Sequence, residues 1–505
     1  MQISPSPELS YNKTLNAILN SKIFQIYFLV FLALLIFLGR QLDTGIPNFD
    51  DAYYAQKAKE IYESGNLWVI TLAGSPDFAN PPLTFWCMAL AYSIFGVSSF
   101  SAIFFPALFG VGVVILTYRL ADYIYKDSWI TFISPLILIF PGIFVDSSRR
   151  AMVDIPLAFF VTFSMFAFLK AKHHKQWYLV FGLATAGGIL SKSVLGIFPL
   201  AIVFLYLFFN RQWKEMFNPF LLLGILIAIG LGFSWHIINW IQFGQNFLNT
   251  HFGVLILDRG FRGSIHPFNF LGYSMDFLRN YWPWLPFALI GLYKFAKRGF
   301  VEKDENSILL FLWPILIFLV MSTSKNHTLR YVIMIFPALS IILAKTFSDW
   351  MDPFWKKIFL RVLLVIACLT ALFVNSTPVQ VKVTLAESSK EVRHLATIIK
   401  LNTPLNEKIG NFKLSYWNPK HAMLFYADRD LENPVTEKEE LLKLLHGNPK
   451  KYWLSNSDEF KSLNSEFPDK FYLIMGNSKY SFFTSSQNRA LVNYDFSGMK
   501  TPNVK

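Results

Sequence analysis

The stretch IFQIYFLVFLALLIFLG (Ile23–Gly39) decides the fold class, because it carries no charged residue and is long enough to cross a bilayer as a helix. A polar stretch, IPNFDDAYYAQKAKEIYESG (Ile46–Gly65), follows it within a few residues. In this second stretch two adjacent carboxylates, Asp50 and Asp51, stand just before a helix expected at residues 52–64. We therefore predict a chain that leaves a membrane and places two acids at the start of its next helix.

The composition of the whole chain agrees with a membrane protein that crosses the bilayer many times. Of its 505 residues 53% are hydrophobic and only 16% are charged, and the mean hydropathy is +0.38. Ordinary soluble domains are much more polar. The net charge of +13 is expected from Lys and Arg in cytoplasmic loops, so we predict no nucleic-acid partner. Cys87 and Cys368 lie in apolar segments, which excludes a disulfide framework and a cysteine-based metal site.

A spanning helix needs roughly 17–25 mostly apolar residues. The candidate spans are 23–39, 100–121, 129–147, 153–169, 177–190, 194–210, 217–240, 281–296, 306–322, 328–347 and 357–375. One further apolar segment, PPLTFWCMALAYSIFG (Pro81–Gly96), is short and begins with two prolines. We predict that this segment lies at the membrane interface or re-enters the membrane. The fold class is therefore a polytopic α-helical membrane protein with about 11–13 transmembrane helices.

The distribution of Lys and Arg gives the expected orientation. With residues 1–22 in the cytoplasm and 81–96 not spanning, inner loops hold more Lys and Arg than the longer outer loops, including KAKHHK (Lys170–Lys175). A spanning 81–96 would put that basic cluster outside, against the positive-inside rule. We therefore predict a cytoplasmic N-terminal segment at 1–22, a transmembrane domain at 23–375 that begins with a retained signal anchor, and a first outer loop at 40–99.

Residues 376–505 are polar and mixed in character. Pieces typical of strands, such as KYWLSN (Lys451–Asn456), alternate with pieces typical of helices, such as EKEELLKLL (Glu437–Leu445). This pattern predicts a soluble α/β domain, which the expected topology places outside the cytoplasm. The DRD triplet at Asp428–Asp430 has the form of a nucleotide-sugar DxD motif, but three residues in a soluble tail are too weak a match to carry a function.

The predicted outer loops bring ionisable residues to one membrane level. They include Asp50 and Asp51, then Arg149, Arg150 and Asp154, then Lys192, then Arg259, and finally Lys325 and Arg330. Ionisable groups at membrane depth are costly and point to a functional site by default.

Plainer roles stay open for the carboxylates. Asp50 or Asp51 could cap the helix at 52–64, where Asp contributes about 1 kcal/mol. Asp154 opens a helix just before Pro156 and could cap that helix in the same way. A residue can also do both.

The cations and histidines have plainer roles as well. Lys192 could extend its amine to the lipid headgroups, and Arg149 and Arg150 could bind lipid phosphate without specificity. His251 and His266 are more typical of loop residues than of metal ligands.

Because the carboxylates and cations of the outer loops are predicted to lie on one face of the membrane, we expect them to form one reaction site. Several cations would hold an anionic lipid headgroup, such as a polyprenyl phosphate, and the planar fork of Arg binds two phosphate oxygens at once. A carboxylate would take a proton from an incoming hydroxyl.

The same residues resemble those of the GT-C superfamily of membrane glycosyltransferases, which includes protein O-mannosyltransferases and aminoarabinose transferases. The first outer loop, NFDDAYYAQKAKEIYESGNLWVITLAGSPDFANPPLTFW, is similar to theirs in its acidic pair, Tyr-Ala, amphipathic helix and Pro-Pro-Leu. Four later segments resemble theirs in the same order, and the resemblance covers about residues 20–350: SRRAMVDIPLAFF, GGILSKSVLGIFPL, LDRGFRGSIHPFNF before YWPWLP, and STSKNHTLRYVIMIFPALSIILA.

The resemblance implies a GT-C fold and an inverting glycosyltransferase similar to families GT39 and GT83, in a bacterial inner membrane. A polyprenyl-phosphate sugar would be the donor, and a lipid, a glycan or a protein would be the acceptor. The implied site has Asp50 as general base with Asp51 and Asp154 as further active-site carboxylates, Arg149, Lys192, Arg259, Lys325 and Arg330 at the donor phosphate, and Tyr53, Tyr54 and Asn80 as substrate contacts in the first loop.

One departure from the superfamily pattern concerns the residues before Pro81-Pro82. Aminoarabinose transferases carry Glu-Lys there, with the Glu as a metal ligand, whereas this chain has Ala79-Asn80. Aminoarabinose transfer and a metal at that position are therefore in question. No cofactor is assigned, and a divalent metal is left open.

Two other classes of protein share some of these sequence features. A transporter or flippase for a polyprenyl-linked substrate would also need outer cations, but it predicts charged or broken helices at the bilayer midplane. The polar groups here gather at one face instead. A membrane-anchored binding protein that works through its soluble tail would not need so many spans.

Overall fold

A computed structural model describes residues 21–39, 45–46, 50–258, 267–324, 328–376, 386–405, 407–415 and 419–486. The chain forms two compact units. The larger unit comprises Met1–Leu42 and Lys57–Gln380, and the smaller comprises Asp43–Gln56 and Val381–Lys505. A short segment of the predicted first outer loop is therefore grouped with the C-terminal part of the chain.

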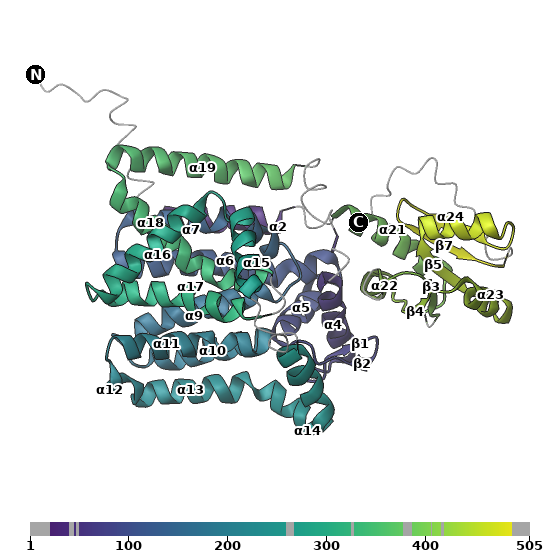
Figure 1. Cartoon of the computed structure of the whole chain (residues 1–505), viewed down its shortest axis with the longest axis horizontal. Helices are drawn as coiled ribbons and strands as arrows, with labels where there is room; N and C mark the ends of the chain where they lie inside the picture. The colour runs from purple at the N-terminus through teal and green to yellow at the C-terminus, as the bar shows by residue number, and fades with distance from the viewer. Residues whose placement is uncertain are drawn as a thin grey trace, which may run out of the picture. The chain divides into compact units, whose positions relative to one another are not determined.

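The larger unit is helical, and its long helices run side by side in Figure 1. A two-stranded hairpin, β1 (Thr71–Leu72) and β2 (Ser75–Pro76), follows the helix at Asp50–Ser64. In chain order the helices are α2 (Lys22–Leu38), α4 (Asp50–Ser64, which begins in the smaller unit), α5 (Leu83–Phe95), α6 (Ser99–Tyr125), α7 (Ser128–Ile139), α8 (Gly142–Ser148), α9 (Asp154–Ala171), α10 (Trp177–Lys192), η1 (Ser193–Ile197), α11 (Phe198–Phe209), α12 (Trp213–Met216), α13 (Pro219–Gly232), α14 (Ser234–Leu248), η2 (Asn249–Asp258), α15 (Pro267–Asn280), α16 (Trp284–Phe300), α17 (Glu305–Ser322), η3 (Leu329–Ile335), α18 (Phe336–Trp350) and α19 (Pro353–Asn375).

Six helical segments of the described chain are long and apolar enough to cross a membrane, and eight if each bent pair counts as one span. The six are Ser99–Tyr125, Asp154–Ala171, Trp177–Phe209, Glu305–Ser322, Leu329–Trp350 and Pro353–Asn375. Two of the expected spans correspond to shorter helices, α2 and α16. The predicted polytopic helical class is confirmed, and the helix at 81–96 is the 13-residue α5.

Two predicted spans differ from straight rods, and two neighbouring ones are separated by a sharp break. The expected span 129–147 is α7 followed by α8, bent by 73° where Pro141 and Gly142 interrupt the helix. The span 217–240 is likewise α13 and α14, bent by 40°. Between α10 and α11 the chain turns back on itself. The evidence is the position of Gly196, where an added Cβ would lie only 2.1 Å from the backbone nitrogen of Ile189. A continuous helix would hold residues seven apart about 10 Å from each other, so the break separates two rods.

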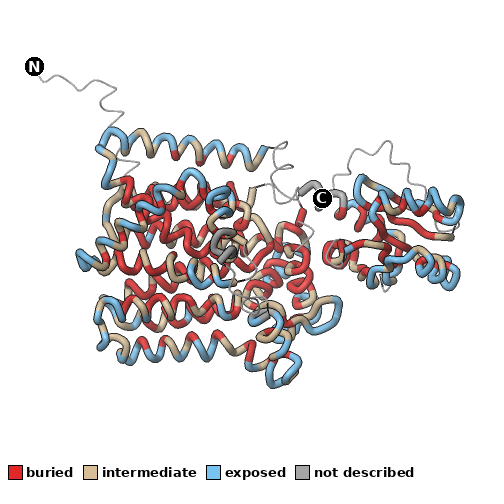
Figure 2. Tube along the Cα trace, viewed as in Figure 1, coloured by how far each residue is buried: buried red, intermediate tan, exposed pale blue. Residues whose placement is uncertain are grey.

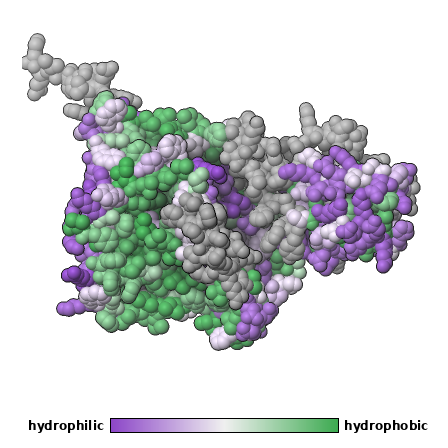
Figure 3. Space-filling model, viewed as in Figure 1, coloured by the Kyte–Doolittle hydropathy of each residue, from purple (hydrophilic) through white to green (hydrophobic). Residues whose placement is uncertain are grey.

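Burial varies from helix to helix within the larger unit. Of the apolar stretch in Leu329–Trp350 83% is buried, against 17% in Pro353–Asn375, and Figure 2 shows the same contrast between the inner helices and α19. On α19, Val365, Leu369 and Leu372 are exposed. The visible face of the bundle is hydrophobic over its middle, with polar residues at helix ends (Figure 3). An apolar exterior of this kind is expected of helices that face lipid.

The C-terminal part of the smaller unit is an α/β domain, as predicted. Its five-stranded sheet has the order β4-β3-β5-β7-β6, in which β3 runs parallel to β4 and β5, and β7 runs antiparallel to β5 and β6. The elements are α21 (Ala386–Asn402), β3 (Ile409–Phe412), α22 (Lys420–Ala427), β4 (Leu431–Val435), α23 (Lys438–Gly447), β5 (Tyr452–Asn456), α24 (Ser457–Glu466), β6 (Tyr472–Gly476) and β7 (Tyr480–Thr484).

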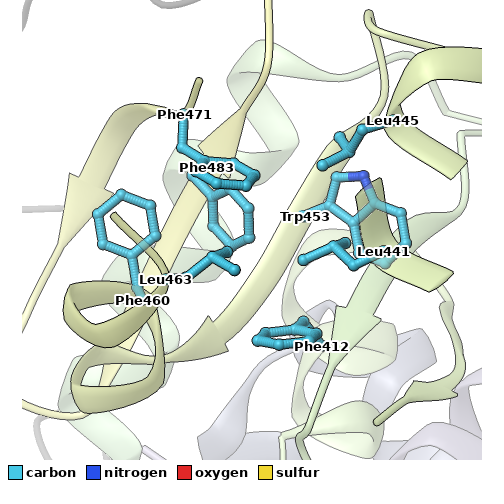
Figure 4. Packing of buried hydrophobic residues seen from close by; sticks show 8 residues of the cluster. All are labelled: Phe412, Leu441, Leu445, Trp453, Phe460, Leu463, Phe471 and Phe483. Carbon is cyan, nitrogen blue, oxygen red and sulfur yellow. The ribbon is translucent and has the colours of Figure 1, made fainter. Parts of the chain in front are cut away.

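Aromatic residues dominate the core of this domain (Figure 4). Trp453 and Phe483 from neighbouring strands are fully buried and pack with Leu441 and Leu445 of α23 and with Phe460 of α24. Large aromatic side chains contribute most of the apolar area that a small core buries. The core explains why this part of the chain forms a compact unit despite its polar composition.

The DRD triplet serves the structure of this domain. Asp428 pairs with Lys400 at 2.6 Å, and Asp430 lies 3.4 Å from Lys420. Arg429 is buried and donates to the carbonyl oxygen of Thr403 at 2.6 Å. Each residue of the triplet thus has a partner within this domain.

Candidate functional site

The centre of the candidate site is a buried ion pair between Lys192 and Asp154. Asp154 is the first residue of α9, and its side chain is 2% exposed. Lys192 ends α10, and its Nζ bonds to the Asp154 carboxylate. The same Nζ lies 4.3 Å from the ring centroid of Tyr331, a cation–π arrangement. The pair holds a cation and a carboxylate together away from water.

The geometry of this pair does not support the simpler roles of the two residues, helix capping by Asp154 and extension of the Lys192 amine to lipid headgroups. Asp154 lies inside the helix, because the capping position of α9 is Val153, which makes no side-chain cap bond. Lys192 is 14% exposed and bonds to Asp154, so it does not extend its amine to headgroups. Both residues therefore have a specific partner in the protein interior, as costly charges near a membrane require.

Two arginines are close in sequence to residues of this site, Arg149 to Asp154 and Arg330 to Tyr331. Arg330, which precedes Tyr331 in η3, places Nη1 2.7 Å from the sulfur of Met152. Arg149 follows α8 and donates to the carbonyl oxygens of Ile36 and Gly39, the latter at 2.9 Å. These carbonyls lie at the C-terminal end of α2, where the helix leaves them without internal partners. Burial lowers the pKa of Arg149 to about 10.

The contacts of Arg149 therefore give it a structural function, and its predicted role at a donor phosphate stays a prediction. Arg150 lies 3.7 Å from Asp146. Arg259 and Lys325 lie outside the described residues, as does His266.

The first outer loop is held in place by polar contacts of α4. Lys57 is fully buried, and its Nζ donates to Asp77 at 2.6 Å. Burial lowers the pKa of Lys57 although the charge of Asp77 opposes that shift. Glu60 accepts from the hydroxyl of Thr71 at 2.6 Å and from the amide of Ala73 at 2.7 Å. The β1–β2 hairpin is thus fixed to the helix that begins with the acidic pair.

The acidic pair and the neighbouring tyrosines belong to the smaller unit and are described within it. Asp50 and Asp51 are the first two residues of α4, so the helix begins earlier than the expected residue 52. Asp51 is fully buried and Asp50 is partly buried. The ring of Tyr53 lies 5.4 Å from that of Tyr54 and 5.1 Å, edge to face, from His421 of α22.

In the first turn of α4 both carboxylates stand near the positive end of the helix dipole, which stabilises negative charge. The backbone nitrogen of Ile46 also donates to the Tyr426 hydroxyl at 2.7 Å. Asn80, in the larger unit, is partly buried just before Pro81.

The sequence reasoning missed a buried cluster of Ser193, His236 and His251. The Ser193 Oγ lies 2.9 Å from the Nε2 atom of each histidine. His251 Nδ1 lies 2.6 Å from the carbonyl oxygen of Phe78 in the first outer loop. A signal was present, because His236 and Asn239 interrupt an otherwise apolar segment and buried polar residues in such segments need partners.

The described residues do not assemble a metal site. No three His, Cys, Asp or Glu side chains among them converge on one point. Both ring nitrogens of His251 already face protein oxygens, and Ala79, at the position where the resemblance places a metal-binding Glu, offers no ligand side chain. No chemical step is therefore derived through a metal.

Fold and site together define a class: a polytopic helical membrane protein with a buried carboxylate–amine pair at the ends of two helices and a braced polar loop. A family model for dolichyl-phosphate-mannose-protein mannosyltransferase matches residues 23–250. An uncharacterized protein from Aquifex aeolicus (strain VF5) is 29% identical over 304 residues, 59% of this chain and 58% of that protein.

Curated transferases and solved structures extend this likeness. Undecaprenyl phosphate-alpha-4-amino-4-deoxy-L-arabinose arabinosyl transferase 2 of Sodalis glossinidius (strain morsitans) is 25% identical over 320 residues, 59% of this chain and 54% of that protein. ArnT from Cupriavidus metallidurans in the apo state superimposes with a TM-score of 0.74 at 16% identity, covering 92% of this chain and 98% of ArnT. The archaeal oligosaccharyltransferase AglB from Archaeoglobus fulgidus gives 0.56 at 14% identity, covering 92% and 74%.

The chain has the GT-C fold, and the expected resemblance to the GT-C superfamily of membrane glycosyltransferases is confirmed. The matched segments span a little over half the length of the curated relatives.

Proposed function

We propose that the protein is an inverting glycosyltransferase that moves a sugar from a polyprenyl-phosphate donor to an acceptor hydroxyl or phosphate at the outer face of a bacterial inner membrane. The acceptor is a lipid, a glycan or a protein. The names of the curated relatives support a donor of this class, since they are undecaprenyl-phosphate sugar transferases. The multiple apolar spans support a lipid-linked donor that never leaves the bilayer.

The proposed reaction is a direct displacement at the anomeric carbon. The acceptor oxygen bonds to that carbon as the bond to the polyprenyl phosphate oxygen breaks, and the phosphate leaves with the electron pair. Asp50 takes the acceptor proton as general base, with Asp51 beside it. Asp154 is the further active-site carboxylate, and Tyr53, Tyr54 and Asn80 contact substrate.

Positive charge would stabilise the leaving phosphate, since charge develops there as the bond breaks. Lys192 and Arg330 are the described cations proposed for this task, and Arg259 and Lys325 are proposed on the sequence resemblance. Arg149 would assist from the end of α2. No nucleotide takes part, because the donor already carries its phosphate leaving group.

The observation that carries the proposal is the Asp154–Lys192 pair. Its carboxylate is 2% exposed and its amine lies against Tyr331. A folded chain tolerates a buried pair of charges at a large desolvation cost. An amine fixed in this way is already oriented when an anionic headgroup arrives, and preorganised charge is what a developing phosphate anion needs.

The test uses membranes that contain the protein, a labelled undecaprenyl-phosphate sugar and a lipid extract as acceptor. The Asp50→Asn variant is expected to lose transfer and to keep its expression and melting temperature. Asp458→Asn is the matched control, because it makes the same change at a carboxylate that is 97% exposed. Full transfer by Asp50→Asn would overturn the base assignment, and wild-type protein that consumes no polyprenyl-linked sugar would overturn the function.

A further inference from the structure

Ser193 holds a backbone conformation that normally belongs to glycine. At the break between α10 and η1 it has φ 50° and ψ −130°. A Cβ makes this region unfavourable, whereas glycine enters it freely. The chain carries a serine here although glycine would fit the turn at less cost. A strained residue of this kind points to a use for its side chain.

The hydroxyl of Ser193 has two buried partners. The Nε2 atoms of His236 and His251 each lie 2.9 Å from its Oγ, and all three residues are buried. A hydroxyl has one hydrogen to donate and lone pairs with which to accept. It can donate to only one of the two rings, so at least one Nε2 must donate to it.

The direction of this bridge follows from His251. Its Nδ1 lies 2.6 Å from the Phe78 carbonyl oxygen, which only accepts, so this nitrogen carries the proton. In the neutral ring Nε2 is then an acceptor, and Ser193 donates to it. Ser193 in turn accepts from the Nε2–H of His236. The result is a directed chain of hydrogen bonds from α14 through Ser193 and His251 to the first outer loop.

Other contacts hold the same loop at the same place. The indole nitrogen of Trp235 donates to the carbonyl of Trp68 at 2.9 Å, and Asn239 donates to it at 3.2 Å. The ring of Phe78 packs 5.3 Å from that of Phe247. Loop residues 68–78 are thus fastened to α14 and η2, and Ser193 joins that assembly to the end of α10.

We propose that Ser193 is a positioning residue that fixes Lys192 in register with the first outer loop. The two residues are adjacent in the chain, yet Lys192 bonds to Asp154 on α9 and Ser193 bonds to the two histidines on α14 and η2. The Ser193 hydroxyl therefore fixes the backbone at the α10–η1 break, and the Lys192 amine extends from that backbone. The claim that Ser193 positions Lys192 for catalysis rests on the proposed glycosyl transfer. The claim that Ser193 holds the first outer loop in place does not.

The test compares Ser193→Gly with wild type and with Ser234→Gly. Glycine suits the backbone of position 193, which offsets part of the cost of leaving two buried histidine nitrogens without this partner. Ser193→Gly should therefore still fold, with its melting temperature measured beside the other data, while losing the bridge. Ser234 is the control because it lies at the neighbouring α13–α14 break and its hydroxyl bonds only locally, to the carbonyl of Leu231 at 2.7 Å, among the contacts described.

Two measurements are made on each purified full-length variant. In Ser193→Gly, amide hydrogen exchange of residues 66–80 should speed up by about tenfold, because the loop has lost its fastening. The kcat for transfer from the labelled undecaprenyl-phosphate sugar should fall on the order of tenfold, with the donor KM changed less than about twofold, since misplaced groups cost rate more than binding. Ser234→Gly should leave both unchanged.

The outcomes separate the two claims. If Ser193→Gly matches wild type in exchange and in kcat, the serine is only a turn residue and the inference is wrong. If amide exchange of residues 66–80 rises but kcat is unchanged, Ser193 holds the loop without positioning Lys192, which also overturns the proposal. If wild-type protein transfers no sugar, the proposed function fails, and the exchange result still decides whether Ser193 fastens the loop.

Discussion

At the scale of single residues, we expect substitutions in the Asp154–Lys192 pair to lower the stability of the fold strongly, because each buried charge is compensated by the other. Removing one partner of a buried pair leaves an uncompensated charge and typically costs about 3 kcal/mol or more, whereas replacing both with apolar residues can be nearly neutral. We expect Asp154→Leu alone to lower the free energy of unfolding by about 3 kcal/mol. The double variant Asp154→Leu/Lys192→Met should recover most of that loss.

Thermal and denaturant unfolding of detergent-purified protein measures this double-mutant cycle. Lys192→Met alone completes the cycle. If the two single changes simply add in the double variant, the charges are not coupled and the pair is not buried as described. Sugar transfer should be lost in all three variants, which separates the role of the pair in stability from its role in the reaction.

The residue scale also shows where sequence reasoning stops. Asp154 and Lys192 were both identified as candidates, each from a polar residue beside an apolar run, but they are 38 residues apart and nothing in the sequence pairs them. Ser193 carries no signal at all, because a positive φ at a non-glycine residue cannot be read from residue type. Its histidine partners were visible only as polar residues in or near apolar segments.

At the scale of elements, short connections between helices are fixed by clusters around a single carboxylate. Glu215 of α12 accepts from Lys175 at 2.7 Å, from the Tyr178 hydroxyl at 3.1 Å and from Asn218 at 3.3 Å. Burial raises the pKa of Glu215, but these hydrogen bonds and the charge of Lys175 outweigh it and hold the pKa below its usual value. The connection between α11 and α13 is thereby tied to the start of α10.

A lowered carboxyl pKa makes the stabilisation depend on pH. Because the unfolded chain binds the proton more readily, the contribution of Glu215 is complete above its unfolded pKa of about 4.5 and is lost as pH falls through the lower folded value. We expect Glu215→Gln to melt below wild type at pH 7, and the gap to close as pH falls below about 4. Differential scanning fluorimetry over this range checks it, with the exposed Glu302→Gln as control. A gap that widens in acid would contradict the assignment.

The ends of helices were predictable where the sequence contains helix-breaking residues such as Pro and Gly. Pro141-Gly142 is a helix-breaking pair inside the expected span 129–147, and the bend of 73° falls there. The start of α4 was missed by two residues, within the usual fraying of helix ends. The bend between α13 and α14 falls at Phe233, between Gly232 and Ser234, a Gly/Ser pair of the kind at which helices kink.

At the scale of the whole molecule, hydropathy and alternation were enough to predict a polytopic helical part and an α/β tail. Apolar runs long enough to span a bilayer have few alternatives, because every backbone polar group in lipid must be bonded within the chain. The grouping of residues 43–56 with the C-terminal part could not be predicted, since it depends on side-chain packing such as that of Tyr53 with His421.

The expected orientation is the remaining property of the whole molecule, and it rests on charge. Helix ends that carry Lys172, Lys175 and Lys214 are predicted to face the cytoplasm, while the β1–β2 hairpin and the C-terminal domain face outward. In a Cys87→Ala/Cys368→Ala background, single cysteines at Ser75 and at Asp458, both exposed, should react with an impermeant maleimide on intact spheroplasts. Lys214→Cys, also at an exposed position, should react only after permeabilisation. The reverse pattern would invert every loop, including the first one, put the basic helix ends outside, and move the proposed reaction to the cytoplasmic face.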